Sequence, residues 1–282
     1  MTPIFPTGAT LLDATLHGGL PNGVCEVYGG PSTGKSALSL SLARETARRG
    51  LGVVHIFVDG LPDKPYWLAS APHDMTLVLP TTGESAFKAA CGAFREGASL
   101  VIIDSATNLE PEIEYRCRMG IRVPRAQLLM VERGLYDVRQ TLRSHEGLLV
   151  LVSQLRRRLQ APVKSLESSL DEVTRRSCAA RIRMERVAYR TAFGDYDYLK
   201  SSTKITQATS CPPGGTASVM FFKGGVDWGF EMMRYLLHKG LLVMRGSSIQ
   251  DRYGNTLGSG YKDCARNINT LREEGKWKFE LR

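Results

Sequence analysis

The chain has 282 residues, of which 43% are hydrophobic and 23% are charged, so it is apolar enough to bury a core and unlike a disordered chain. No run approaches 18 consecutive apolar residues, which argues against a membrane span, and the first ten residues do not resemble a secretory signal. Six scattered cysteines form no Cys-x-x-Cys pair; they argue against a zinc ribbon or a disulfide scaffold and favour the reducing cytoplasm.

The charge is unevenly distributed. Lys and Arg outnumber Asp and Glu by 37 to 28, a net charge of +9, which is compatible with a polyanionic partner. Residues 110–190 contain 17 cationic and 10 acidic residues, and 16 of these cations are arginines, which suit forked contacts with phosphate. Most of the positive excess therefore lies in one central segment.

Apolar strands and helices alternate along the first two thirds of the chain. Such alternation predicts a mostly parallel sheet with helices on both faces. We therefore expect an α/β core over residues 1–222 and a small α+β C-terminal domain over 223–282. In chain order, the predicted strands cover 24–28, 53–58, 100–103, 148–152 and 219–222, and the predicted helices cover 35–49, 84–96, 127–144 and 228–239.

A glycine-rich turn joins the first predicted strand to the first predicted helix. The sequence Gly29-Gly30-Pro31-Ser32-Thr33-Gly34-Lys35-Ser36 contains the pattern G-x-x-x-x-G-K-[ST], in which backbone N–H groups surround phosphates. We expect Lys35 to reach the β- and γ-phosphates and Ser36 to bind Mg²⁺, so that ATP and Mg²⁺ are the cofactors. A chance match is the alternative, but the placement between strand and helix disfavours it. The residues predicted to hold the nucleotide are Gly30, Pro31, Ser32, Thr33, Gly34, Lys35 and Ser36.

Two polar residues follow later strands. Asp104 ends the strand that begins at Leu100 and is predicted to hold Mg²⁺ through water, although an aspartate there can also cap a helix. Gln154 follows the strand over 148–152 and is predicted to sense a γ-phosphate, with an ordinary surface role as the alternative. Arg156, Arg157 and Arg158 come next and begin a long basic loop that ends at Arg175 and Arg176. The alternative is that the three arginines are charged surface residues exposed to solvent without a specific role.

Four stretches, in order, resemble the RecA family of recombinases. They are residues 8–23 before the phosphate loop, Val101-Ile102-Ile103-Asp104-Ser105-Ala106, Val152-Ser153-Gln154-Leu155-Arg156, and residues 225–260, which resemble the bacterial C-terminal domain. The resemblance implies a RecA-like P-loop NTPase core and a DNA-dependent ATPase. It implies self-association into a helical filament on single-stranded DNA, pairing with homologous duplex DNA, and ATP at the subunit interface.

The resemblance also assigns roles to residues. Lys35 and Gln154 would be the catalytic residues, with Gln154 coupling the ATP state to the second DNA loop, and Lys204 is the best match to a lysine that reaches the ATP of a neighbouring subunit. Two loops, 112–124 and 156–176, would hold DNA, and Arg125 follows the first. The arginines expected to contact DNA are Arg116, Arg118, Arg122, Arg125, Arg156, Arg157, Arg158, Arg175 and Arg176, with a solvated helix start as the alternative for Arg122 and Arg125.

The chain also departs from the family pattern. Leu61 stands where the family has a catalytic glutamate, and Asp59 or Asp63 is a possible substitute off the family's spacing. A lost carboxylate predicts ATP binding with slow hydrolysis. The N-terminal polymerisation helix is missing, so Ile4-Phe5 is a candidate filament anchor, with core packing as the alternative. An ATP-dependent DNA strand-exchange recombinase of the bacterial or phage type is the leading interpretation. A catalytically weak paralogue, acting as a repair accessory or regulatory protein, is second, and another RecA-like ATPase is third.

Overall fold

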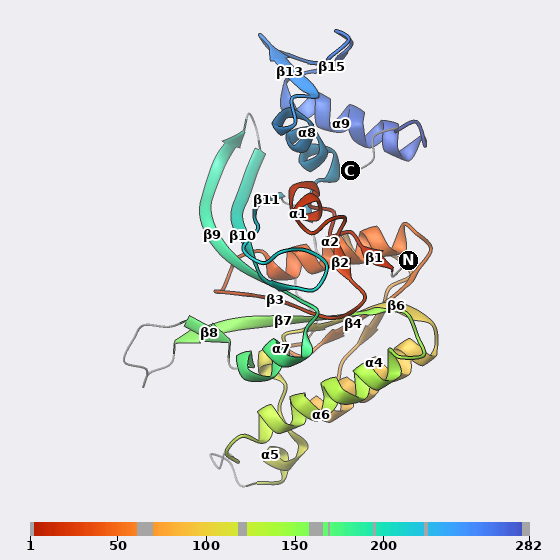
Figure 1. Cartoon of the computed structure of the whole chain (residues 1–282), viewed down its shortest axis with the longest axis vertical. Helices are drawn as coiled ribbons and strands as arrows, with labels where there is room; N and C mark the ends of the chain where they lie inside the picture. Colours follow the sequence, from red (N-terminus) through yellow and green to blue (C-terminus); the bar gives the residue numbers. More distant parts are fainter. Residues whose placement is uncertain are drawn as a thin grey trace.

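The computed structural model describes residues 3–60, 70–117, 123–157, 166–168, 170–193, 196–222 and 225–277. Within them, one large sheet has the strand order β12-β11-β10-β9-β3-β7-β6-β4-β5, and β8 pairs with β7 off this path (Figure 1). The strands from β9 to β5 run parallel, whereas β10, β11 and β12 are antiparallel. The strands are β3 (Gly23–Gly29), β4 (Gly52–Phe57), β5 (Thr76–Val78), β6 (Ala98–Asp104), β7 (Leu148–Arg157), β8 (Leu166–Ser168), β9 (Ala180–Phe193), β10 (Tyr196–Ala208), β11 (Thr216–Phe222) and β12 (Gly225–Val226).

Helices cover both faces of the sheet. Figure 1 shows α2 (Lys35–Ala47) on one side and α4 (Gly83–Arg95) and α6 (Ala126–Thr141) on the other. Two separate clusters of buried apolar residues fill these layers. The alternation of strand residues between the two faces explains both clusters, because neighbouring residues of one strand enter opposite layers. The expected α/β fold with a mostly parallel sheet is confirmed.

The sequence of α4 shows why a helix forms here. Thr82 caps its N-terminus: the Thr82 hydroxyl accepts a hydrogen bond from the Ser85 amide at 3.1 Å, and the Ser85 hydroxyl accepts one from the Thr82 amide at 3.0 Å. This reciprocal pair satisfies two amides that the helix leaves unpaired. Phe87, Cys91 and Phe94 follow at helical spacing and are all buried against the sheet.

The long β9–β10 hairpin was not predicted from the sequence. Ala180, Ile182 and Met184 alternate and are fully buried, but register shifts interrupt the pairing, and charged residues occupy the other face. The expected loop over 156–176 is also wrong for its described part, because β7 continues to Arg157 and α7 (Asp171–Ser177) begins within it. Acidic residues open α7 and arginines close it, an arrangement that favours a helix through its dipole.

The N-terminal residues form part of the core. The strand β1 (Ile4–Phe5) pairs with β2 (Leu20–Pro21), and α1 (Thr10–Thr15) lies between them in the sequence. The Phe5 side chain is 3% exposed within the cluster that packs against α2. Phe5 therefore packs in the core, the alternative stated for Ile4-Phe5, and is not free to anchor a neighbour, whereas Ile4 is exposed and its role as an anchor stays a prediction.

A third apolar cluster joins the helices α8 (Trp228–His238) and α9 (Gly260–Glu273) of the C-terminal part to Tyr198 of β10 and Met220 of β11. The central sheet continues to β12, just beyond residue 222, so the predicted boundary between 222 and 223 lies at the sheet's edge and remains a prediction. Arg272 of α9 pairs with Glu45 of α2 and stacks over the Trp228 ring, 3.9 Å from its centroid, which ties this part to the core. The elements are α8 (Trp228–His238), β13 (Leu242–Arg245), β14 (Ser248–Asp251), β15 (Thr256–Ser259) and α9 (Gly260–Glu273).

The described helices include none long and apolar enough to cross a membrane. All six cysteines are free thiols. Two short helical segments, η1 (Ala106–Asn108) and α5 (Glu112–Arg116), follow β6 and lead toward α6.

Candidate nucleotide site

The turn between β3 and α2 closes around its own lysine. Ser32 and Gly34 take left-handed backbone conformations, with φ angles of 54° and 87°. A Cβ at Gly34 would lie 2.5 Å from the Phe221 ring, so a larger residue would collide there. The Lys35 Nζ donates a hydrogen bond to the Gly30 carbonyl oxygen at 2.7 Å. The first N–H groups of α2 lack partners within the helix, which is the chemistry that binds phosphate.

The neighbouring strands support this turn. A Cβ at Gly29 would lie 2.2 Å from the Met184 carbonyl oxygen of β9, so only glycine allows the two strands to approach so closely. The Ser201 hydroxyl of β10 donates to the Thr33 carbonyl oxygen at 2.8 Å, and the Thr33 hydroxyl donates to the Gly30 carbonyl oxygen at 3.0 Å. The hairpin that the sequence analysis missed therefore helps to shape the phosphate loop.

Asp104 brings a carboxylate to the start of α2. Burial raises the pKa of Asp104 from 3.8 to about 6, against a hydrogen bond with the Ser36 side chain and the charge of Lys35, which lower it. The nearby charge of Asp59 raises it further. Burial also lowers the pKa of Lys35, and Asp104 opposes that shift. The structure thus brings together Lys35, Ser36 and Asp104, which the sequence predicted from two motifs far apart.

These groups fit Mg²⁺ and a nucleotide phosphate. A hydroxyl and a carboxylate within hydrogen-bonding reach of each other supply oxygen ligands of the kind that Mg²⁺ prefers. The 7% exposed Lys35 supplies a positive charge at the opening of the helix. The roles assigned to the three side chains remain predictions.

Gln154 lies beside the phosphate loop. In the pairing of β7 with β3, Gln154 is directly opposite Gly29, where the loop begins. The Gln154 backbone N–H donates a hydrogen bond to the Thr107 hydroxyl at 3.4 Å, and that hydroxyl also contacts the Ser105 hydroxyl at 2.8 Å. The position agrees with a residue that contacts a terminal phosphate, while the sensing role stays a prediction.

Asp59 and Asp63 are the two candidates to replace the carboxylate that Leu61 lacks. Leu61 and Asp63 lie outside the described residues. Asp59 follows β4, and its Oδ1 accepts a hydrogen bond from the Asn108 side chain at 2.8 Å. Since its charge influences the pKa of Asp104, Asp59 lies close to the predicted Mg²⁺ ligands.

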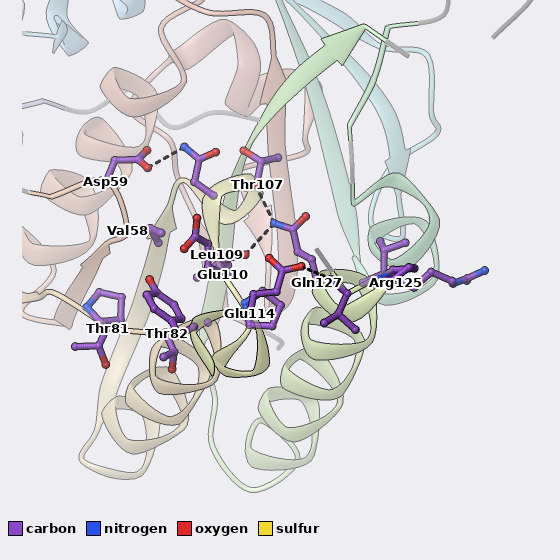
Figure 2. A pocket seen from close by; sticks show the side chains of 18 residues that line it. Val58, Asp59, Thr81, Thr82, Thr107, Leu109, Glu110, Glu114, Arg125 and Gln127 are labelled. Carbon is purple, nitrogen blue, oxygen red and sulfur yellow. Dashed lines mark hydrogen bonds between the residues drawn. The ribbon is translucent and has the colours of Figure 1, made fainter. Parts of the chain in front are cut away.

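A cavity of about 700 Å³ adjoins this edge of the sheet. Figure 2 shows Asp59 on one side of it and Arg125 and Gln127 on the other. The Gln127 side chain donates to the carbonyl oxygens of Thr107 and Leu109, both at 2.9 Å, and so holds α6 against the segment after β6. No short sequence pattern predicts this cavity, because its lining comes from segments that are far apart in the chain.

Comparison with known proteins identifies the family. A model of the RecA N-terminal domain matches residues 2–217. The chain belongs to the RecA family. This RecA-family chain is 32% identical over 161 residues to Protein RecA of Xanthomonas axonopodis pv. citri (strain 306), which covers 55% of this chain and 47% of that protein. It is 32% identical over 160 residues to Protein RecA of Xylella fastidiosa (strain M23), covering 55% and 46%. The match thus spans about half the length of these relatives, and the core is a RecA-like core.

The arginines expected to bind DNA in this RecA-family chain are only partly described. Arg118, Arg122 and Arg158 lie outside the described residues. Arg156 and Arg157 belong to β7, whose backbone there pairs with β8, and their side chains are also outside the described set. The other four are exposed and pair with acidic residues of the same chain: Arg116 with Glu112 at 2.5 Å, Arg125 with Glu172 at 3.3 Å, Arg175 with Asp171 at 2.6 Å and Arg176 with Glu172 at 3.9 Å.

Lys204 lies away from the phosphate loop of its own chain. It is exposed on β10, whereas Ser201, which contacts the loop, is buried on the other face of that strand. Lys204 is directly opposite Arg183 of β9 and Thr216 of β11. A contact with nucleotide would have to involve another copy, as the family resemblance implied, and this remains a prediction.

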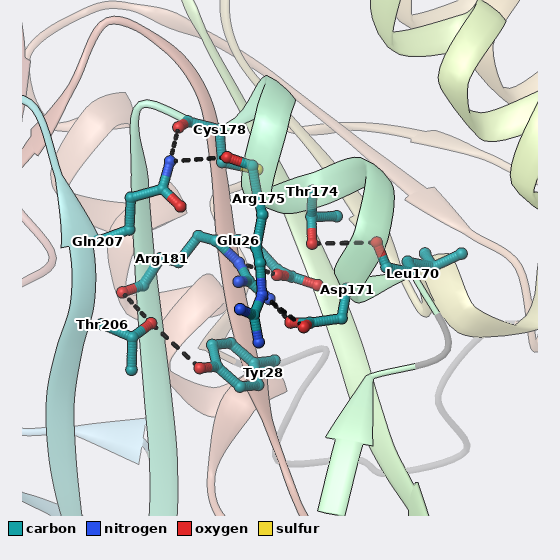
Figure 3. Close-up of polar contacts among 10 residues, drawn as sticks. All are labelled: Glu26, Tyr28, Leu170, Asp171, Thr174, Arg175, Cys178, Arg181, Thr206 and Gln207. Atoms are coloured by element: carbon teal, nitrogen blue, oxygen red, sulfur yellow. Dashed lines mark hydrogen bonds and ion pairs between the residues drawn. The ribbon is translucent and has the colours of Figure 1, made fainter. Parts of the chain in front are cut away.

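A buried ionic network, which the sequence analysis missed, anchors α7. Figure 3 shows Arg181 of β9 between Glu26 of β3 and Asp171 of α7. The Arg181 Nε donates to Glu26 Oε2 at 2.7 Å, and its guanidinium lies 4.8 Å from the centroid of the Tyr28 ring. The network links the strand that leads into the phosphate loop to the helix that carries Arg175. An arginine within an apolar strand pattern was the available sequence signal.

Proposed function

We propose that the protein is an ATP-dependent recombinase that binds single-stranded DNA and pairs it with homologous duplex DNA in the cytoplasm. ATP with Mg²⁺ would occupy the loop around Lys35, with Ser36 and Asp104 as the metal ligands. Copies of the chain would assemble along DNA, with Lys204 directed to a neighbour's nucleotide. Membership of the RecA family supports this proposal, although the match covers only about half of the relatives' length.

One observation carries the proposal most directly. The phosphate loop, Asp104 and Gln154 meet at one edge of the sheet, and Gln154 lies on the strand that continues into the basic segment. A ligand change at the phosphates can therefore reach Arg156 and Arg157 through a single strand. Arginine-rich segments suit the backbone of single-stranded DNA, where electrostatic attraction dominates binding.

With ATP and Mg²⁺ bound, the reaction would be transfer of the terminal phosphoryl group to water. Lys35 would stabilise charge on the transferring phosphoryl group, and Gln154 would contact the terminal phosphate. No apolar side chain can align the attacking water, so Leu61 predicts slow turnover. The same residue supports a second candidate function: a catalytically weak paralogue that binds ATP and DNA and regulates a partner in DNA repair.

Electron microscopy and joint-molecule measurements test the proposal. The chain is mixed with circular single-stranded DNA and a non-hydrolysable ATP analogue, and its filaments are imaged; joint-molecule formation with homologous duplex is then measured. Filaments and joint molecules would support the recombinase. Binding of ATP and DNA without joint molecules would favour the paralogue, and a lack of ATP-dependent DNA binding would contradict both.

A further inference from the structure

A second cavity lies between the central sheet and α8. It has a volume of about 670 Å³, in the range of sites that hold small organic ligands. We call it the α8 cavity; its walls come from α1, β10, β11, α8 and the start of α9. Its lining includes Lys200, Ser218, Met220, Arg234, Tyr235 and Lys239, none of which belongs to the phosphate-loop site.

The α8 cavity is positively charged. Lys200, Arg234 and Lys239 line it, and its described lining includes no carboxylate. Glu231, buried beneath it, pairs with Arg234 at 2.6 Å and offsets that one charge. Neither Lys200 nor Lys239 forms an ion pair with any residue in the described part of the chain. Two lysine charges are therefore available to an anionic ligand.

Compensation of the α8 helix dipole does not explain why three cations line the α8 cavity. Cations at the last turn of a helix compensate its dipole, and Lys239 is the C-cap residue of α8. Lys200, however, comes from β10, directly opposite Met220 of β11. Arg234 is held against the sheet, because its guanidinium donates to the Ser218 hydroxyl at 2.6 Å. Two separate elements, β10 and α8, thus direct three cations into one cavity.

Aromatic side chains complete the lining. Half-buried Tyr261 lies in the cavity wall with the buried rings of Phe230 and Tyr235 behind it, and the Lys239 ammonium is 5.6 Å from the centroid of the Tyr235 ring. Aromatic faces stack on nucleobases without strong base preference, and lysines bind the attached phosphates. A nucleotide unit supplies both groups within one small molecule.

The α8 cavity lies back to back with the phosphate loop. Alternate residues of a strand face opposite sides of the sheet. On β10, Ser201 donates to the phosphate loop while Lys200 lines the cavity, and on β11, Phe221 lies against Gly34 while Met220 lines the cavity. The cavity is thus a separate site that shares two strands with the first one.

We propose that the α8 cavity is a second ligand site, which takes a nucleotide phosphate together with its aromatic base. Lys200 and Lys239 bind the phosphate, and the aromatic wall packs against the base. The ligand is either a free nucleotide or one unit of a nucleic acid strand, since both present the same chemistry. This site does not depend on hydrolysis at the phosphate loop.

Binding measurements on paired variants test this site. The free-nucleotide arm titrates ADP by calorimetry into the Lys35→Ala chain, in which the phosphate loop is disabled. The strand arm measures binding of fluorescein-labelled oligothymidylate to the otherwise wild-type chain by anisotropy. In each background, Lys200→Ala with Lys239→Ala is compared with Lys88→Ala with Arg95→Ala, which removes the same charge from exposed positions on α4. Lys200→Arg with Lys239→Arg keeps the charge, and thermal melts confirm that every variant is folded.

We expect the Lys200→Ala, Lys239→Ala variant, called the cavity variant, to bind one of the two ligands at least about tenfold more weakly than its parent. The α4 control and the arginine variant should keep an affinity close to that of the parent. Loss of ADP binding in the Lys35→Ala background identifies a free nucleotide. Loss confined to the oligonucleotide identifies a strand. If the Lys200→Ala, Lys239→Ala variant and the α4 control bind each ligand with the same affinity, the α8 cavity is not a ligand site. The effect of Lys35→Ala on ATP binding tests only the proposed function and not this site.

Discussion

Arg181 and Glu26 form an ion pair in the middle of the sheet, with 2.7 Å between the guanidinium Nε and the carboxylate Oε2 and almost no exposure of either side chain. The pair joins β9 to β3, two strands that run parallel and both support the phosphate loop. Asp171 binds the same guanidinium from α7. One buried arginine therefore connects β3, the strand that leads into the phosphate loop, to α7.

Breaking this pair should destabilise the protein strongly. Arg181→Met leaves the Glu26 carboxylate buried without its cation, which costs about 3–5 kcal/mol of unfolding free energy. Urea denaturation of Arg181→Met, Glu26→Gln and the double variant measures the cost, and the double variant should recover part of it. As a control, Arg133→Ala removes an exposed ion pair with Asp137 and should cost less than about 1 kcal/mol. Equal costs for Arg181→Met and Arg133→Ala would contradict the structural importance of the buried pair.

Lys35→Ala should weaken ATP binding at the phosphate loop about 10- to 150-fold without unfolding the chain. The lost charged hydrogen bonds to phosphate are worth about 1.5–3 kcal/mol, and the loop keeps its contacts through Thr33 and Ser201. Calorimetry with ATP and Mg²⁺ measures the affinity, with Lys88→Ala as a control for loss of one exposed lysine charge. An unchanged ATP affinity in Lys35→Ala would show that the nucleotide binds elsewhere.

Mg²⁺-dependent nucleotide binding should weaken as the pH falls through about 6. Folding raises the pKa of Asp104 from 3.8 to about 6. In the protein without ligand, the protonated Asp104 therefore stabilises the fold below pH 3.8, and this stabilisation is lost as the pH rises through about 6. Mg²⁺ needs the charged carboxylate, so acid opposes binding. Calorimetry at about pH 7.5 and about pH 5.5, with and without Mg²⁺, measures the effect. Asp104→Asn should remove the Mg²⁺-specific part; the same pH dependence in that variant would assign it to another group.

Affinity for single-stranded DNA should fall steeply with salt. Each phosphate contact releases counterions and contributes about −0.7 to the slope of log K against log salt. Replacing Arg156, Arg157 and Arg158 together by alanine should therefore flatten the slope by about two. The matched control replaces Lys88, Arg95 and Arg133, which lie on α4 and α6, and should change the slope less. Equal slopes for the two triple variants would move the DNA site away from the second loop.

Wild-type ATP hydrolysis should be well below that of a family member with the glutamate, and Leu61→Glu should raise it. A carboxylate can accept a proton and align water, whereas leucine can do neither; contributions of general-base catalysis are about 10²–10⁴-fold. Steady-state phosphate release on single-stranded DNA measures the rate. Asp59→Asn and Asp63→Asn serve as comparisons. If the wild type hydrolyses ATP rapidly and Asp59→Asn or Asp63→Asn stops the reaction, that aspartate is the residue that aligns the water.

Short-range patterns predicted the nucleotide edge of the fold well. Gly34, Lys35 and Ser36 follow an apolar strand within a few residues, and Asp104 ends another, so periodicity and turn chemistry suffice to place them. Their meeting required the further rule that parallel strands end at one edge, and the structure agrees with it. The strand and helix bounds were correct to within a few residues for these elements.

Long-range pairing escaped the sequence analysis. The β9–β10 hairpin carries bulges and a charged face, which hide its alternation, and Arg181 meets a glutamate 155 positions earlier only because β9 lies beside β3. The α8 cavity likewise depends on the packing of α8 against β10 and β11. Local propensity acts over a few residues, so it specifies turns and single elements; strand order and register are settled by burial of the whole core, which no short window of sequence contains.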